Sequence, residues 1–446
     1  MPVKVGMVSL GCSKNQVDAE HMLYRIREAG WEFGEEPGLC DVVIINTCGF
    51  IESAKQESIE NILEFVTLKE EGRIKVICVT GCLAERYADE VREELPEADV
   101  ILGIGKNAEI VQAISAALEG KKTTSFGNKE DLPLEGGRVI ANLPFYAYLK
   151  IAEGCDNNCS YCAIPGIRGK FRSRKMEDIL KEARWMAENG VSEINLIAQD
   201  TTRYGEDLYN ELKLPQLLSK LSEIEEIRWI RLLYCYPERV TDELLDVIAH
   251  EDKVVKYIDL PLQHVVKRVL NDMNRPGDET SLRGLIARIR EKIPGVTLRT
   301  TMITGFPGET DEEFEQLCGF VREVKFDRLG CFSYSREEDT PAYDMPNQID
   351  AETAQCRADI IMEIQMEISA AKSALLVGQT ITVLCEGFDR YAERWFGRSA
   401  ENAPDVDGKV FFSAQQKPQP GDYVQVLITD SMDYDLIGER VNEVCE

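Results

Sequence analysis

Residues 151–174 read IAEGCDNNCSYCAIPGIRGKFRSR and place three cysteines, Cys155, Cys159 and Cys162, at the spacing C-x3-C-x2-C. No histidine or further cysteine follows nearby to complete a tetrahedral zinc site. Thiolate is the usual ligand of the irons in a cubic iron–sulfur cluster, and three ligands leave one iron free to bind something else. The spacing therefore favours an open iron–sulfur cluster, with zinc bound by the Cys159–Cys162 pair as the alternative.

The composition limits the classes of protein that fit. The chain has 446 residues, enough for two or three domains, and a formal net charge of −28. This charge disfavours a large nonspecific nucleic-acid surface and favours basic partners. With no signal peptide and no apolar run of membrane-spanning length, we expect a cytoplasmic protein without membrane contact. In that compartment clustered cysteines favour metal ligands over disulfides.

Residues 1–120 alternate apolar runs with helical patterns. The runs VKVGMVSLGC, DVVIINTC and IKVICVTGC end at Cys12, Cys48 and Cys82, and a fourth, ADVILGIG, ends without a cysteine. Continuous Val/Ile runs between helices predict a doubly wound parallel sheet. Ligands bind beyond the carboxyl ends of such strands, so the three cysteines could converge on one metal site. The alternative is that they only pack at the strand ends.

The rest of the chain divides into four stretches. Residues 121–142 are polar and rich in Gly and Lys, which predicts a linker. Residues 143–350 alternate six candidate strands with helices, which predicts a parallel (β/α)6 barrel, whole or partial, with the C-x3-C-x2-C loop after its first strand. We expect a connecting helix over 351–376 and a small antiparallel β-barrel over 377–446. The predicted fold class is thus α/β with a small terminal β-barrel.

Together these features resemble the radical S-adenosylmethionine (SAM) methylthiotransferases. The C-x3-C-x2-C motif resembles that of the radical SAM barrel, and the N-terminal cysteines and the terminal β-barrel, similar to a TRAM domain, match the rest of that family's plan. The resemblance covers nearly the whole chain. It implies two 4Fe-4S clusters: one that cleaves SAM, on Cys155, Cys159 and Cys162, and an auxiliary one that supplies sulfur, on Cys12, Cys48 and Cys82.

The resemblance also suggests contacts to SAM outside the cysteines. They are Tyr161 before the last motif cysteine, Gln199 and Asp200 after the second barrel strand, Gln263 and His264 after the fourth, and Gly305 after the fifth. Plainer alternatives are loop packing for the tyrosine, helix capping for the aspartate, a satisfied polar group for the histidine and a turn for the glycine. The basic stretch 168–175 could bind the SAM carboxylate or an acidic substrate group, or form a solvated face.

The family has two substrate branches. One methylthiolates a modified adenosine in tRNA, and the other modifies an aspartate in a small-subunit ribosomal protein. SLGCSKNQVDAE (9–20) and YAERWFGRSAENAPDVDG (391–408) resemble the second branch, although Ser13 departs from the proline common there. Residues 378–446 hold 13 acidic and 6 basic residues, a net charge of −7, which suits a basic ribosomal protein better than RNA.

The interpretation is therefore an aspartate methylthiotransferase that inserts a methylthio group at the β-carbon, using two clusters and two molecules of SAM. Methylthiolation of tRNA is the alternative, and a non-catalytic iron–sulfur factor on the ribosome is a third class. Trp395, Asp405 and Asp407 are the candidate contacts to the ribosomal protein. An electron donor such as flavodoxin or ferredoxin is implied, and tRNA is not expected as a partner. Both cysteine triads should face one cavity, because the radical must reach the sulfur-accepting carbon at near-contact distance.

Overall fold

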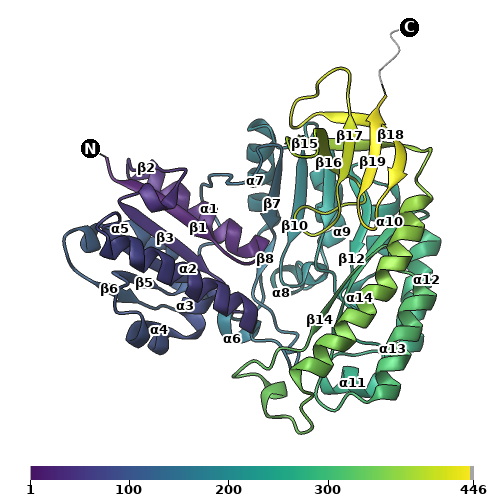
Figure 1. The fold of residues 1–446 in the computed structure, drawn as a ribbon, viewed down its shortest axis with the longest axis horizontal. Coiled ribbons are helices and arrows are strands. Elements are labelled where there is room, and N and C mark those ends of the chain that lie inside the picture. Colours follow the sequence, from purple (N-terminus) through teal and green to yellow (C-terminus); the bar gives the residue numbers. More distant parts are fainter. Residues whose placement is uncertain (1, 442–446) are drawn as a thin grey trace.

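The computed structural model describes residues 2–441, and its N-terminal part is a six-stranded sheet (Figure 1). The strand order is β2-β1-β3-β4-β5-β6, and all neighbours are parallel. The strands are β1 (Lys4–Ser9), β2 (Glu32–Phe33), β3 (Val42–Thr47), β4 (Val76–Gly81), β5 (Val100–Leu102) and β6 (Thr123–Ser125).

Helices cover both faces of this sheet. The core of one face takes residues from α1 (Ser13–Glu28) and α5 (Ile110–Leu118). The core of the other takes residues from α2 (Glu52–Glu70), α3 (Cys82–Arg86) and α4 (Ala88–Glu94). Every residue of β3 and β4 is buried, as their unbroken apolar runs require. The doubly wound parallel sheet is confirmed.

The stretch interpreted as a linker, residues 121–142, is partly structured. Strand β6 lies inside it and pairs with β5, so the sheet continues beyond residue 120. Arg138 in the same stretch is buried and pairs with Glu20 of α1 and Glu182 of the central part. The linker interpretation is therefore wrong for these residues, because polar composition alone could not reveal their partners elsewhere in the chain.

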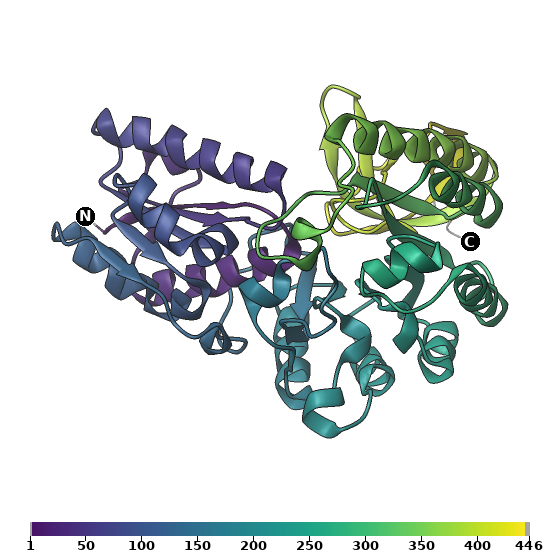
Figure 2. The ribbon, with the colours of Figure 1, turned by 90° about the horizontal axis from the view of Figure 1, so that it is seen from below.

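The central part holds six parallel strands in sequence order, β7 to β14, with β7 and β14 at the two edges. They are β7 (Tyr146–Lys150), β10 (Glu193–Ile197), β11 (Trp229–Leu232), β12 (Val254–Asp259), β13 (Thr297–Thr304) and β14 (Arg328–Ser333). The connecting helices include α7 (Met176–Glu188), α9 (Leu214–Ser222), α10 (Asp242–His250), α12 (Glu279–Lys292) and α13 (Asp311–Val324), which form an arc outside the strands (Figure 2). This is the expected partial (β/α)6 barrel.

The cysteine loop of the barrel is closed at its base by a short hairpin. Strands β8 (Ala152–Glu153) and β9 (Arg172–Ser173) pair in antiparallel fashion, and α6 (Ile164–Arg168) lies between them. The hairpin brings the two ends of the loop together, so the C-x3-C-x2-C segment projects from a fixed base.

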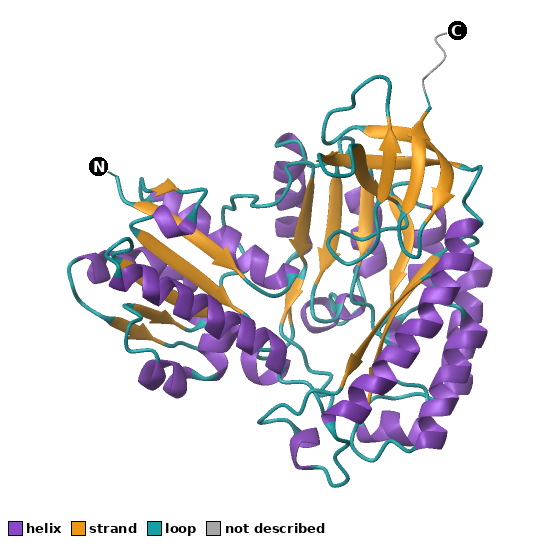
Figure 3. Cartoon of the chain, in the orientation of Figure 1, coloured by secondary structure: helices purple, strands orange, loops and turns teal. Residues whose placement is uncertain are grey.

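The C-terminal part is a closed five-stranded barrel reached through α14 (Ala351–Ala374) (Figure 3). Its strands are β15 (Thr380–Asp389), β16 (Arg394–Ser399), β17 (Val410–Ser413), β18 (Tyr423–Ser431) and β19 (Leu436–Arg440). The expected antiparallel barrel is confirmed except at one seam, where β17 and β19 run parallel. The predicted barrel reached residue 446, and residues 442–446 lie outside the described part of the chain.

The small barrel packs against the beginnings of the central strands. Arg398 of β16 pairs with Glu193, the first residue of β10, at 2.7 Å, and both side chains are buried. Tyr423 of β18 packs edge-on against Trp229, the first residue of β11. The carboxyl ends of the central strands are thereby left for the N-terminal part. No helix within residues 2–441 is long and apolar enough to cross a membrane.

Gly305 serves packing against α14. It follows β13 with a φ of +71°, and a Cβ there would lie 2.8 Å from the Cα of Ala354 and closer still to its Cβ. Its backbone N–H donates to Glu309 Oε2 at 3.0 Å. This glycine therefore permits a close approach to a helix, whereas its expected contact with SAM stays a prediction.

We predict that Gly305→Ala lowers the free energy of unfolding by about 1–3 kcal/mol, because the new methyl group collides with α14 and the backbone is left-handed. Gly284→Ala is the matched control, because Gly284 lies within α12 and a Cβ there would meet no atom within 4 Å. This control should keep or raise stability. Denaturant unfolding of both variants measures the effect, and unchanged stability of the Gly305 variant together with weaker SAM binding would restore the cofactor role.

Candidate active site

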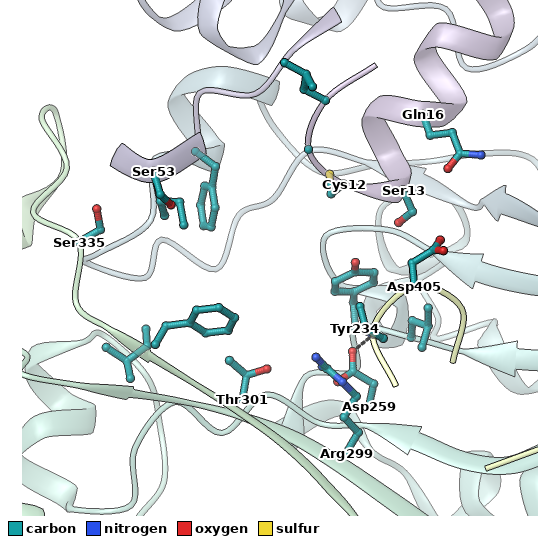
Figure 4. A pocket seen from close by; sticks show the side chains of 18 of the residues that line it. Cys12, Ser13, Gln16, Ser53, Tyr234, Asp259, Arg299, Thr301, Ser335 and Asp405 are labelled. Atoms are coloured by element: carbon teal, nitrogen blue, oxygen red, sulfur yellow. Dashed lines mark hydrogen bonds and ion pairs between the residues drawn. The ribbon is translucent and has the colours of Figure 1, made fainter. Parts of the chain in front are cut away.

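One large cavity, of about 1270 Å³, lies where the three parts of the chain meet. Its wall includes Cys12 and Phe50 from the N-terminal part, Tyr161 and Arg299 from the central barrel, and Asp405 from the C-terminal barrel (Figure 4). Loops at the carboxyl ends of β1 and β3 face the carboxyl-end side of the central barrel across it. The two sheets direct their carboxyl ends at this cavity, but Cys12 is the one candidate cluster ligand among the described residues that line it. The expectation that both cysteine triads face one cavity therefore stays a prediction.

The three N-terminal cysteines follow β1, β3 and β4, and the geometry brings their loops together. Gly11 has a φ of +90°, and a Cβ there would lie 2.9 Å from the Sγ of Cys48. The Cys82 thiol is close enough to Cys12 and Cys48 for their charges to raise its pKa further, although burial is the main cause that brings that pKa to about 12. Cys12 is exposed towards the cavity and Cys82 is buried.

Arg168 connects this triad to the barrel. Its Nη2 donates to Cys82 Sγ at 3.3 Å, and its Nη1 donates to Asp18 at 2.8 Å and to Glu153 at 3.1 Å. The guanidinium is 1% exposed, so its charge acts on the nearby thiols with little screening by water. The sequence placed Arg168 in a basic stretch whose role was open between ligand contact and a solvated face. The solvated face is excluded for Arg168.

The barrel triad lies on the loop closed by β8 and β9. The N–H of Cys155 donates to the carbonyl of Gly169 at 3.1 Å, and that of Cys162 donates to the carbonyl of Cys159 at 3.0 Å. Burial, with a smaller contribution from the charge of the neighbouring Cys159, raises the pKa of Cys155 to about 11. A second cavity, of about 400 Å³, is lined by Cys159 and Cys162 together with Arg86 of the N-terminal part.

Two residues that the sequence did not single out contact Cys159. Arg275 Nη1 donates to its Sγ over 3.9 Å, and the Tyr236 hydroxyl lies 4.0 Å from the same sulfur. The Arg275 guanidinium also stacks on the Tyr236 ring, 4.3 Å from its centroid. Both residues come from loops far from the motif in sequence, so no local pattern could indicate them.

Both donor sets fit an iron–sulfur cluster. Each offers three thiols with a buried arginine beside them, and a cluster ligand must be a thiolate, which a nearby cation stabilises. Within residues 2–441, no three His, Cys, Asp or Glu side chains are grouped to hold a single metal ion. A cubic cluster binds each cysteine through a different iron, so its ligands need no common point.

Three of the expected SAM contacts lie near the barrel triad or on the cavity wall. Tyr161 lines the large cavity and packs against the cluster around Phe306. Gln263 also lines the cavity, with a left-handed φ of +70°. Gln199 donates to Glu153 at 2.6 Å, while its buried Oε1 has no hydrogen-bond partner among the described residues. That oxygen is an acceptor left available for a ligand.

Asp200 positions the cysteine loop. Its carboxylate accepts hydrogen bonds from Asn157, Thr202 and Arg239 at 2.9, 2.6 and 2.9 Å. It makes no side-chain bond to the backbone of the helical turn that follows, so the capping alternative is excluded. The contact with Asn157 ties Asp200 to the motif itself, two residues after Cys155.

His264 lies in the core behind the cavity. Its side chain is fully buried, and it does not contribute to the wall of the large cavity. Burial lowers its pKa to about 3, so the ring is neutral at pH 7. Its Nδ1 accepts from the N–H of Val266 at 3.1 Å, which places the proton on Nε2, 3.6 Å from Glu309. Its Nε2 has no hydrogen-bond partner among the described residues, so the alternative of a satisfied polar group holds at Nδ1 alone, and the cofactor contact stays a prediction.

The three candidate contacts to the substrate lie in three different environments. Asp405 lines the cavity and accepts from the Tyr148 hydroxyl at 3.0 Å. Asp407 accepts a hydrogen bond from the Tyr257 hydroxyl at 2.7 Å, and its side chain is only 3% exposed. It therefore belongs to the contact between the two barrels, and the prediction that it contacts the ribosomal protein is wrong. Trp395 is half-buried, packs edge-on against Phe388 and lies away from the cavity wall.

Comparison with known proteins agrees with this organisation. Residues 4–103 match an uncharacterized protein family, UPF0004, residues 149–321 match the radical SAM superfamily, and residues 377–441 match the TRAM domain. A protein of Desulforamulus reducens named ribosomal protein uS12 methylthiotransferase RimO is 49% identical over 98% of this chain and 99% of its own length. One of the same name from Pelotomaculum thermopropionicum is 48% identical over 99% and 100%.

The chain belongs to the RimO family of radical SAM methylthiotransferases. Among solved structures, the radical SAM methyltransferase TsrM from Kitasatospora setae, with tryptophan substrate and a SAM analogue bound, superposes with a TM-score of 0.55. It is 12% identical and covers 74% of this chain and 72% of its own, which supports the shared fold alone.

The charges around Cys12 predict how its thiol titrates in metal-free protein. Although Cys12 is exposed towards the cavity, the protein around it removes part of its water, which acts to raise its pKa. The charges of Lys14 and Arg168, together with backbone N–H groups, act in the opposite direction, and the net effect is a lowered pKa. Arg168→Gln removes one of these charges and should raise the pKa, which moves the pH profile of Cys12 alkylation upward by about one pH unit, because the thiolate is the reactive form. Peptide-level mass spectrometry after iodoacetamide labelling measures the profile.

Arg172→Gln is the control for this experiment. Arg172 belongs to the same basic stretch, but its side chain bonds the carbonyls of Lys129 and Glu130 and no cysteine. Its removal should leave the Cys12 profile unchanged. Equal displacement of the profile in both variants would mean that general charge, and not the Arg168 contact, sets the titration.

Proposed function

We propose that this chain attaches a methylthio group to the β-carbon of an aspartate in ribosomal protein uS12, using two 4Fe-4S clusters and two molecules of SAM. The names of relatives at 48–49% identity over nearly the full length support the reaction and the substrate. The observation that carries the proposal is the large cavity between the two motifs. Its wall includes Cys12 of one triad and Tyr161, which stands between Cys159 and Cys162 in the other motif.

In this proposal Cys155, Cys159 and Cys162 hold the cluster that binds SAM, and Cys12, Cys48 and Cys82 hold the auxiliary cluster. When bound, these groups supply the radical, the sulfur and the methyl group. The protein contributes position and charge. Arg168 and Arg275 place buried cations beside the two sets of thiols, and Asp200 holds the loop of the first set through Asn157.

The remaining contacts to SAM are proposed at the barrel side of the cavity. The unpaired Oε1 of Gln199 offers an acceptor for the ammonium group of the methionine part. Tyr161 and Gln263 form part of the wall against which the adenosine part would lie. These assignments use groups whose hydrogen-bonding capacity or surface is not consumed inside the protein.

Charge supports a basic protein as the substrate. Residues 378–446, which form the C-terminal barrel and its connections, carry a net −7 that includes Asp405, and the cavity wall adds the acidic residue Glu52. A basic ribosomal protein is attracted by such a surface, whereas the phosphates of tRNA are repelled. The same proposal assigns the reaction to the cytoplasm, where ribosomes are made, with a flavodoxin or ferredoxin as the electron donor.

Two sets of substitutions test which cysteine triad holds which cluster. Replacing Cys155, Cys159 and Cys162 together by Ala should leave roughly half the iron and abolish formation of 5'-deoxyadenosine. Replacing Cys12, Cys48 and Cys82 should also leave roughly half the iron, but retain SAM cleavage and abolish methylthiolation of uS12. Iron assay after anaerobic reconstitution, product chromatography and mass spectrometry of uS12 provide the three readouts.

Cys78→Ala is the matched control, because Cys78 is fully buried within β4 and belongs to neither triad. It should retain both clusters and full activity. Wild-type protein that binds the iron of only one cluster would contradict the two-cluster proposal, and methylthio groups found on tRNA but not on uS12 would contradict the substrate.

A further inference from the structure

The charged side chains on the wall of the large cavity are acidic with one exception. Glu52, Asp259, Glu337 and Asp405 contribute carboxylates to it, and among the described residues that line it Arg299 has the one basic side chain. Glu337 is already paired with Lys55 and Arg86, and Asp259 is paired with Arg299 itself. Arg299 is therefore the residue of this wall whose charge attracts an anionic group. The charge pattern therefore marks a single place for an anionic ligand group.

Strand geometry directs Arg299 at the cavity. Residues 299, 301 and 303 of β13 alternate with buried neighbours, and Arg299, Thr301 and Ile303 all line the cavity. Arg299 therefore projects from a rigid strand of the barrel and not from a loop. Figure 4 shows it on the barrel side of the cavity, with Thr301 and Asp259 beside it and Cys12 on the opposite side.

The guanidinium is held in place but not saturated. Its Nη1 donates to Asp259 Oδ1 at 2.9 Å, and its Nε lies 3.9 Å from Asp407 of the C-terminal barrel. Its Nη2 makes no hydrogen bond to any residue within 2–441. Gly330 on the adjacent β14 has no side chain to cover that nitrogen, to which a Cβ would come within 3.9 Å. The side chain is 18% exposed, so its free donors reach the cavity.

The other arginines near the site are occupied. Arg168 is shared among Cys82, Asp18 and Glu153, and Arg174 pairs with Glu135 and Glu182. The basic stretch that seemed from sequence to offer an anion contact is thus committed to internal ion pairs at both of these positions. Of these three arginines, Arg299 lines the cavity and has an Nη2 without a hydrogen-bond partner among the described residues.

We infer that Arg299 binds the side-chain carboxylate of the substrate aspartate and thereby selects aspartate at the reacting position. This inference rests on the proposed function. Arginine donates hydrogen bonds to a carboxylate through a fork of parallel N–H groups, and it does so more strongly than to a neutral amide. Because the rest of the wall is acidic, pairing at Arg299 also fixes which residue of a basic substrate segment enters the cavity.

The first test changes the substrate and leaves the enzyme intact. Reconstituted, SAM-loaded wild-type enzyme should bind a uS12 peptide that carries the target aspartate about tenfold or more tightly than the same peptide with Asn there. Equal dissociation constants for the two peptides would overturn the inference whatever the variants do.

The second test changes the enzyme. Arg299→Gln should reduce the Asp/Asn preference to near one, and Arg299→Lys, which keeps the charge, should retain part of it. Formation of 5'-deoxyadenosine from SAM without peptide is measured in both variants as well, because it reports on the cofactor and not on the peptide. Arg322→Gln is the control, because Arg322 is exposed on α13 and does not line the cavity, and it should keep the wild-type preference.

The readouts separate the alternatives. SAM also carries a carboxylate, so loss of SAM binding or of peptide-free SAM cleavage in a folded Arg299→Gln variant would assign Arg299 to the cofactor and overturn the inference. Retention of the full Asp/Asn preference by that variant would also overturn it. If wild-type enzyme does not modify the uS12 peptide at all, the proposed function fails; if it does and the preference survives Arg299→Gln, only this inference fails.

Discussion

The buried ion network around Asp18 fixes the N-terminal sheet on the central barrel. Asp18 of α1 accepts from Lys150 at 2.5 Å and from Arg168 at 2.8 Å, and Glu153 pairs with the same two cations. All four side chains are at most 1% exposed. Charges so far from water are tolerated only in good mutual geometry, and removal of one partner from such a network costs about 3–5 kcal/mol.

This network also sets the distance between the two cysteine triads. Asp18 lies on the helix that Cys12 precedes, Glu153 lies two residues before Cys155, and Arg168 ends α6 beyond Cys162 while it contacts Cys82. A shift of the N-terminal sheet or of the central barrel would leave a buried charge without its partner. The position of each triad is therefore tied to the other by electrostatics, which suits a reaction that requires near-contact geometry.

Much of the architecture could be predicted from sequence, because strands buried on both faces have unbroken apolar runs and turns carry Gly, Pro and Asp. The six barrel strands and the sheet that ends at Cys12, Cys48 and Cys82 follow from such local patterns. Features that depend on distant partners were missed. The residues next to β6 in the sequence do not reveal that it pairs with β5. Those next to Gly305 do not reveal that it packs against α14.

The charged residues were the hardest to interpret for the same reason. Asp407 lies in an acidic stretch that suggests a docking surface. Its carboxylate instead accepts hydrogen bonds from the Tyr257 hydroxyl and from the N–H of Ala403. Arg168 and Arg299 look alike in sequence, and only their partners distinguish a saturated cation from an available one. A charge acquires its role from what faces it across the fold, and such pairs join residues that are often more than a hundred positions apart.

The contrast between surface and interior charge explains how so acidic a chain can hold anionic groups. The formal net charge is −28, and the clusters proposed on the two cysteine triads would add negative charge in a region of low dielectric constant. Arg168 beside Cys82 and Arg275 beside Cys159 provide a local cation for each set of thiols. Surface acids are screened by water and salt and act on partners, whereas buried arginines act at short range on the sulfur ligands. The negative surface residues and the buried arginines can therefore act on different partners without cancelling each other's effect.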